Sequence, residues 1–202
     1  ERLVDADVVV ASPGISPESP VLRELAERGV RWISEPEFAA RFFTGSLIAV
    51  TGTNGKTTTT LLVDHLLRAA GISAAAGGNV GGGLAPPASD LARAQDQADW
   101  IVLEMSSFQL AGVDAFRPDI GVVTNLSPDH LDRYASVEDY YADKARLFDN
   151  ADSGSVWVLP TDDAGVEKLA GDAQGSRFYF GNGPRSHAFV DQGVLTLRSS
   201  GD

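Results

Sequence analysis

The residues best suited to do chemistry lie in one short segment, Val50-Thr51-Gly52-Thr53-Asn54-Gly55-Lys56-Thr57-Thr58. An apolar run over 47–50 precedes it, and a leucine-rich helical pattern that ends at Gly71 follows it. Glycines between a strand and a helix let backbone N–H groups point at an anion, and the helix N-terminus adds a partial positive charge. In such loops the lysine reaches the β- and γ-phosphates and the next hydroxyl binds Mg²⁺. We therefore expect a nucleoside triphosphate to be bound by Gly52, Thr53, Asn54, Gly55, Lys56, Thr57 and Thr58.

The spacing of this loop departs from the usual pattern G-x-x-x-x-G-K-[ST], which would place a glycine where Val50 stands. The alternative is a glycine turn that caps an ordinary helix and leaves Lys56 in solvent. The strand pattern before the loop and the helix pattern after it favour phosphate binding.

Two further polar side chains follow apolar strand patterns. Glu104 comes directly after the buried run 100–103, and His130 follows the run 119–125. Ligands of open α/β sheets bind beyond the carboxyl ends of the strands, where the phosphate loop also lies. When it occurs alone, a carboxylate at such a position is usually a helix cap, and a lone histidine is usually a structural hydrogen bonder. Together with a phosphate loop, they favour coordination of Mg²⁺ by Glu104 and His130.

Lys144 falls on the apolar stripe of a helix predicted to begin after the N-cap Ser136. A lysine there commonly lays its stem over apolar surface and keeps its charge in water. The alternative is that burial lowers its pKa and leaves a neutral, nucleophilic amine. Such an amine could react with CO₂ to give a carbamate, which turns a cation into an anionic metal ligand. Both interpretations remain open from the residues alone.

The glycine-rich stretch 77–83 contains Asn79 just beyond a weak strand pattern. It could be a flexible linker, or a loop whose backbone approaches a ligand closely. Residues 5–43 alternate between strand and helix patterns, and Gly45-Ser46 marks a boundary. After it we expect Leu62, Leu66, Ala69 and Ala70 on the packed face of the helix that follows the phosphate loop. A hairpin ends the chain. The alternation predicts an α/β fold with a mostly parallel sheet flanked by helices.

The composition excludes several classes of protein. A net charge of -12 argues against a nucleic-acid-binding surface, and the absence of cysteine excludes disulfides and thiolate metal sites. No apolar run approaches the roughly 20 residues of a membrane span. The start of the sequence does not look like a signal peptide and lacks Met, so we expect a piece of a longer cytoplasmic protein, and we expect that protein to be a monomer. His65 and His187 receive no role.

The chain resembles the Mur ligase family. The resemblance rests on six motifs in the family's order: SPGI at 12–15, the loop at 52–58, GGNVG at 77–81, EMSSFQL at 104–110, NLSPDHLDRY at 125–134 and KAR at 144–146. Together they run through most of the first 150 residues. The SPGI and SSFQL motifs favour the member that adds D-glutamate. One departure is Pro160-Thr161-Asp162-Asp163, where many members have Asn-Ala-Asp-Asp; no role is assigned there.

The resemblance implies an ATP-dependent amide ligase of peptidoglycan precursor synthesis, with UDP-N-acetylmuramoyl-L-alanine and D-glutamate as substrates. It implies that Lys56, His130 and Lys144 are catalytic. Thr57 and Glu104 would share one Mg²⁺, and His130 and carbamylated Lys144 a second. Gly14, Asn79 and Ser106 would contact the UDP substrate. Residues 1–45 would be the C-terminal part of a UDP-substrate domain and 46–202 an incomplete ATP-binding domain. The D-glutamate domain would lie outside this sequence, so we expect these residues alone to be inactive.

Three alternatives stay open. A folylpolyglutamate synthetase-like ligase would use the same ATP chemistry, although the SPGI and SSFQL motifs speak against it. A P-loop phosphotransferase or GTPase would leave Lys144 without a role, and the guanine-reading N-K-x-D motif is absent. The third is a nucleotide-binding module without catalysis.

Overall fold

The computed structural model describes residues 5–129 and 133–198, in which strands and helices alternate along the chain. The strands are β1 (Val9–Ala11), β2 (Trp32–Ser34), β3 (Ser46–Thr51), β4 (Ala74–Gly78), β5 (Trp100–Glu104), β6 (Ile120–Val123), β7 (Val156–Pro160), β8 (Ser176–Phe180), β9 (Ala188–Asp191) and β10 (Val194–Leu197). The helices are α1 (Pro20–Glu27), α2 (Glu35–Ala40), α3 (Lys56–Ala69), α4 (Ala88–Ala92), α5 (Ser107–Ala111), α6 (Val137–Ala145) and α7 (Ala164–Ala170). Short 3₁₀ turns lie at Gly81–Gly83 and Arg146–Phe148.

The main sheet has eight strands in the order β10-β9-β8-β7-β6-β3-β5-β4. Its neighbouring strands run parallel except β9 and β10, which form the predicted hairpin. The predicted α/β class with a mostly parallel sheet is therefore confirmed. The phosphate loop follows β3, which lies between β5 and β6. This order brings the ends of three strands together at the loop.

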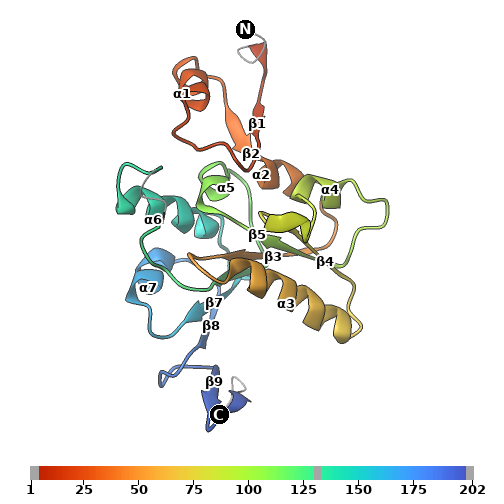
Figure 1. The fold of residues 1–202 in the computed structure, drawn as a ribbon, viewed down its shortest axis with the longest axis vertical. Helices are drawn as coiled ribbons and strands as arrows, with labels where there is room; N and C mark the ends of the chain where they lie inside the picture. Colours follow the sequence, from red (N-terminus) through yellow and green to blue (C-terminus); the bar gives the residue numbers. More distant parts are fainter. Residues whose placement is uncertain (1–4, 130–132, 199–202) are drawn as a thin grey trace.

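Alternate residues of the central strands face two separate apolar cores. Leu47 and Ala49 of β3 belong to the larger core, and Ile48 and Val50 belong to the core beneath α3. Helix α3 runs along one side of the sheet, and α2, α4 and α5 lie on the other (Figure 1). Because successive side chains of a strand point to opposite faces, apolar runs such as 47–50 are needed when both faces are covered.

The packed face of α3 differs from the expectation. Val63 and Leu67 pack against the sheet, whereas Leu62 and Leu66 are 51% and 57% exposed. The expectation that Leu62 and Leu66 form the packed face is wrong. Both pairs have the same helical spacing of four residues, so periodicity could not distinguish them. The sheet decides which stripe is buried.

The first elements form a small unit of their own. Strands β1 and β2 pair in parallel, and α1 packs on them with Leu22 and Leu25. This unit and the β9–β10 hairpin lie at opposite ends of the molecule (Figure 1). Helix α2 differs, because Ala39 is part of the larger core of the sheet. The division into domains at residue 45 stays a prediction.

The glycine-rich stretch is part of the fold, so the linker interpretation is wrong. Gly77 and Gly78 end β4, which pairs with β5, and Gly81–Gly83 form a 3₁₀ turn. Gly78 has φ +93°, and a Cβ there would overlap the backbone carbonyl oxygen of Glu104. Glycine at 78 thus allows β4 to approach the end of β5 closely.

Candidate functional site

The phosphate loop has the predicted strand, turn and helix geometry. Strand β3 ends at Thr51, and α3 starts at Lys56 after Gly55, which has φ +81°. Gly52 has φ +136°, and a Cβ there would overlap the Thr124 hydroxyl. Glycine is therefore required at Gly52 by both conformation and space.

The strip of chain after β6 holds the loop in shape. The backbone N–H of Thr53 donates to the carbonyl of Asn125 at 3.1 Å. The Asn125 side chain accepts from the N–H of Asn54 at 2.9 Å and donates to its carbonyl at 2.9 Å. The Thr124 hydroxyl donates to the same carbonyl at 2.7 Å. Thr124 and Asn125 therefore fix the loop, a role that we did not assign from the sequence; their polar character at a strand end was the available signal.

Thr57 and Glu104 meet where β3 and β5 end. The Thr57 hydroxyl donates to Glu104 Oε2 at 2.6 Å, and the Asn79 side chain donates to Oε1 at 3.4 Å. Glu104 is only 3% exposed. A hydroxyl and a carboxylate beside a phosphate loop are the hard oxygen donors that suit Mg²⁺. The structure thus brings together two of the predicted metal ligands and one predicted substrate contact.

Lys144 is buried on α6, as the apolar stripe indicated. Its side chain is 1% exposed, and Nζ donates to the Gly52 carbonyl at 2.8 Å. Burial, and to a smaller degree the positive charge of Lys56, lower the pKa of Lys144 to about 7. A substantial fraction of this amine is therefore neutral at neutral pH, which makes it a nucleophile. The Lys56 ammonium itself donates to the Thr53 carbonyl at 2.9 Å.

The remaining predicted site residues come from several segments of the chain. Ser106 is the N-cap of α5. Its hydroxyl accepts the backbone N–H of Gln109, and its own backbone N–H donates to Gln109 Oε1, which completes a capping box. Thr58 lies exposed in the first turn of α3. Gly14 lies exposed after β1, in the turn where the Ile15 N–H donates to the Ser12 carbonyl. His130 lies outside the described residues, so its predicted roles are untested.

Asp163 also has a structural role here. It accepts hydrogen bonds from the N–H groups of Gly165 and Val166 and so caps α7. Its second oxygen accepts the N–H of Leu126 at 2.9 Å. The carboxylate therefore ties α7 to the strip after β6 that holds the phosphate loop.

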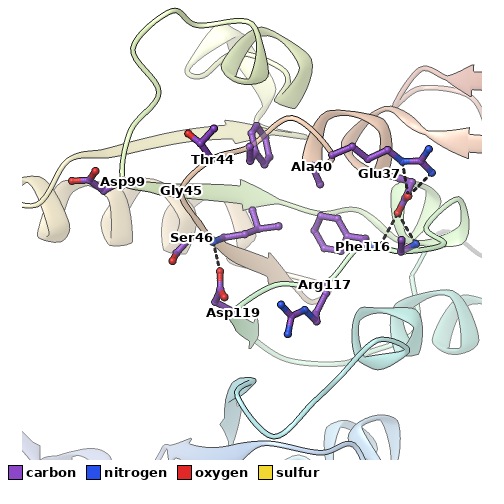
Figure 2. Close-up of a pocket in the computed structure, with 13 residues that line it drawn as sticks. Glu37, Ala40, Thr44, Gly45, Ser46, Asp99, Phe116, Arg117 and Asp119 are labelled. Atoms are coloured by element: carbon purple, nitrogen blue, oxygen red, sulfur yellow. Dashed lines mark hydrogen bonds and ion pairs between the residues drawn. The ribbon is translucent and has the colours of Figure 1, made fainter.

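A cavity of about 720 Å³ lies at the other end of the central strands, away from the phosphate loop. Figure 2 shows its walls, which come from the end of α2, the start of β3 and the residues before β5 and β6. Asp119, on one wall, accepts the backbone N–H of Leu47 at 2.7 Å. Ligands of open α/β sheets bind at the carboxyl ends of the strands, and this cavity is at the amino ends. We therefore place the candidate site at the phosphate loop.

The described residues contain neither a membrane-spanning helix nor a cluster of three metal-binding side chains. Across 5–129 and 133–198, no helix is long and apolar enough to cross a membrane. In the same ranges, no three His, Cys, Asp or Glu side chains form a group able to hold a metal ion. A metal bound at Glu104 would therefore take at least some of its other ligands from further oxygen donors, such as hydroxyls, carbonyls, the nucleotide or water.

Comparison with known proteins identifies similar sequences and folds. The sequence model of the Mur ligase middle domain matches residues 50–201. The UDP-N-acetylmuramoylalanine–D-glutamate ligase of Trichlorobacter lovleyi is 41% identical over 201 residues, which cover 97% of this chain and 44% of that protein. The ligase of the same name from Christiangramia forsetii is 43% identical over 166 residues, covering 82% and 36%.

A solved murein peptide ligase from Psychrobacter arcticus shares the fold. Its TM-score is 0.63 at 18% identity, and the match covers 96% of this chain and 46% of that one. The chain spans about two fifths of the length of the curated relatives that it matches.

Proposed function

The chain belongs to the Mur ligase family, and from this premise we propose that it is the ATP-binding part of a cytoplasmic ligase that joins D-glutamate to UDP-N-acetylmuramoyl-L-alanine. The relatives that carry this name are about 40% identical across most of the chain. The observation that carries the proposal is the 2.6 Å contact of Thr57 with Glu104 beside the phosphate loop. It joins two oxygen donors, 47 residues apart, at one place.

The proposed reaction has two steps. The carboxylate of UDP-N-acetylmuramoyl-L-alanine attacks the γ-phosphorus of ATP, which forms an acyl phosphate and releases ADP. The D-glutamate amine then attacks the acyl carbon and loses a proton, and inorganic phosphate leaves. Transfer of a phosphoryl group depends mainly on alignment and on stabilisation of charge.

The residues around the loop would supply these requirements. Lys56 and the backbone N–H groups at the start of α3 would hold the β- and γ-phosphates, because the N–H groups of Thr53 and Asn54 donate to Asn125. Thr57 and Glu104 would hold Mg²⁺, which neutralises charge on the phosphoryl oxygens. Asn79, Ser106 and Gly14 would contact the UDP substrate.

Lys144 would serve this site as a carbamate. Its neutral amine attacks CO₂, a C–N bond forms as one C=O π bond opens, and a proton leaves to solvent, so that the neutral amine becomes an anionic carbamate. This modified side chain and His130 would hold a second Mg²⁺. Support comes from the burial of Lys144, its pKa of about 7 and its contact with the Gly52 carbonyl.

The domain assignment is part of the proposal. Residues 1–45 would belong to the UDP-substrate domain and 46–202 to the ATP-binding domain, with D-glutamate bound by a further domain. Residues 1–202 alone would then bind nucleotide without forming the amide.

The test is ADP release by the longer ligase that carries this chain. We expect turnover to require UDP-N-acetylmuramoyl-L-alanine and D-glutamate together. ADP release that is indifferent to the muramoyl substrate would refute the proposal and favour a phosphotransferase or a simple nucleotide-binding module.

The carbamate is tested with Lys144→Ala. We expect this variant to be inactive and short carboxylic acids to restore part of the activity. Lys168→Ala, which removes an exposed lysine from α7, is the matched control. Normal turnover by Lys144→Ala would refute the carbamate.

A further inference from the structure

Three segments of the candidate site meet at the Thr53 hydroxyl. It donates to the Ser127 carbonyl at 2.9 Å, and the N–H of Ser127 donates to it at 2.9 Å. Its third neighbour is the Tyr140 hydroxyl at 3.2 Å. Thr53 is 7% and Tyr140 1% exposed, so bulk water does not replace these bonds. The contact joins the phosphate loop, the strip after β6 and helix α6.

The direction of the third hydrogen bond follows from the number of hydrogens. A threonine hydroxyl has one hydrogen and two lone pairs. Thr53 gives its hydrogen to the Ser127 carbonyl and accepts the Ser127 N–H, which leaves one lone pair. The Tyr140 hydroxyl is therefore the donor to Thr53. The Thr53 hydroxyl has no hydrogen left for a phosphate oxygen.

This bond lies one helical turn before Lys144. The Tyr140 ring is 4.8 Å from Lys144 Nζ, which donates to the Gly52 carbonyl at 2.8 Å. Helix α6 is thus attached to neighbouring residues of the loop at two points, by Tyr140 at Thr53 and by Lys144 at Gly52. Loss of the first attachment would let the helix and the Lys144 side chain shift relative to the loop.

We propose that Tyr140 is a positioning residue, whose hydroxyl acts through Thr53 to hold α6 and Lys144 in register with the phosphate loop. The catalytic meaning of this role rests on the proposed ligase function. Because reactive groups must be aligned closely, a shift of about 1 Å costs on the order of a hundredfold in rate. Thr53 then contributes to ATP binding through the shape of the loop.

Tyr140→Phe tests the contact itself, because it removes the hydroxyl and keeps the ring. We expect the backbone amides of Thr53 and Ser127 to exchange hydrogen roughly fivefold faster, the loss of about one neutral hydrogen bond. Exchange in the β5 and β7 amides should not change. The matched control is Tyr141→Phe, the same change at a half-buried position one residue along α6.

Steady-state kinetics of the longer ligase test the consequence. We expect Tyr140→Phe to lower kcat about tenfold or more, with the KM for ATP within about twofold. Thr53→Val removes the hydroxyl and should lower kcat at least as much as Tyr140→Phe, whereas Thr53→Ser keeps the hydroxyl and should lower kcat less than Thr53→Val.

The outcomes separate the two proposals. Exchange in Tyr140→Phe equal to that in Tyr141→Phe, or faster by the same factor in every strand, overturns the positioning role. Local loosening with unchanged kcat overturns it as well. If the ligase without substitutions forms no amide, the proposed function fails. Faster exchange confined to the Thr53 and Ser127 amides of Tyr140→Phe would still support the positioning contact.

Discussion

Replacing Glu37 by alanine is expected to destabilise the protein by about 3–4 kcal/mol. Its Oε2 accepts the backbone N–H groups of Asp114, Ala115 and Phe116 at 3.1, 3.1 and 2.8 Å. Its Oε1 accepts from Arg41 at 2.8 Å. Through these bonds the carboxylate fastens α2 to the segment between α5 and β6.

The magnitude follows from what each N–H group loses. That of Phe116 is buried, so leaving it unpaired costs about 1–3 kcal/mol. Those of Asp114 and Ala115 are partly buried. Water can reach them, and each loses about 0.5–1.5 kcal/mol. Glu37→Gln keeps one acceptor oxygen for the three N–H groups but loses the charge and the oxygen that accepts from Arg41, so we expect about 1–2 kcal/mol.

Urea unfolding and thermal melts measure these differences. For a chain of this size, 3–4 kcal/mol corresponds to roughly 6–16 °C in Tm. Glu24→Ala is the control, since Glu24 and Arg28 form an i,i+4 pair with side chains about half exposed, worth about 0.3–0.5 kcal/mol. A Glu37→Ala variant within about 1 kcal/mol of Glu24→Ala would refute this account.

Three further predictions concern the loop and its supports. The pKa of Lys144 is about 7 in the folded protein and near 10.5 in the unfolded chain. Because the unfolded chain binds more protons between these values, stability relative to Lys144→Met should rise from pH 7 to 10. Urea unfolding in CO₂-free buffer checks this, and a pH-independent difference would contradict it. Gly52→Ala should destabilise the protein by roughly 3 kcal/mol and Gly55→Ala by about 1–2 kcal/mol. Both positions have a positive φ, but only at Gly52 would the added Cβ also overlap a neighbouring side chain. Equal losses in Tm would be inconsistent with this. Asp163→Ala should destabilise the protein by about 2–3 kcal/mol, because α7 loses its cap and the Leu126 N–H loses its acceptor. Asp162→Ala, at the exposed neighbouring position, should cost less than about 0.5 kcal/mol. Equal losses of stability in chemical unfolding would rule out the capping role.

Features that depend on neighbouring residues could be predicted from the sequence. The glycines and lysine of the loop are contiguous, so their pattern is local and predicts the turn before α3. The burial of Lys144 is also local, because helical periodicity places it on one stripe with Tyr140. The same reasoning failed for α3, where two apolar stripes had equal spacing and only the sheet decided which of them packs.

Contacts between distant segments required the tertiary structure. The Thr57–Glu104 contact depends on β3 lying beside β5, and the Thr53–Ser127 contact on β3 lying beside β6. Strand order arises from packing and from the connections between strands, and neither periodicity nor a motif encodes it. The sequence by itself predicts which residues have the chemistry to bind phosphate and metal. The fold decided which of them meet, because only the pairing of strands sets distances between residues far apart in the chain.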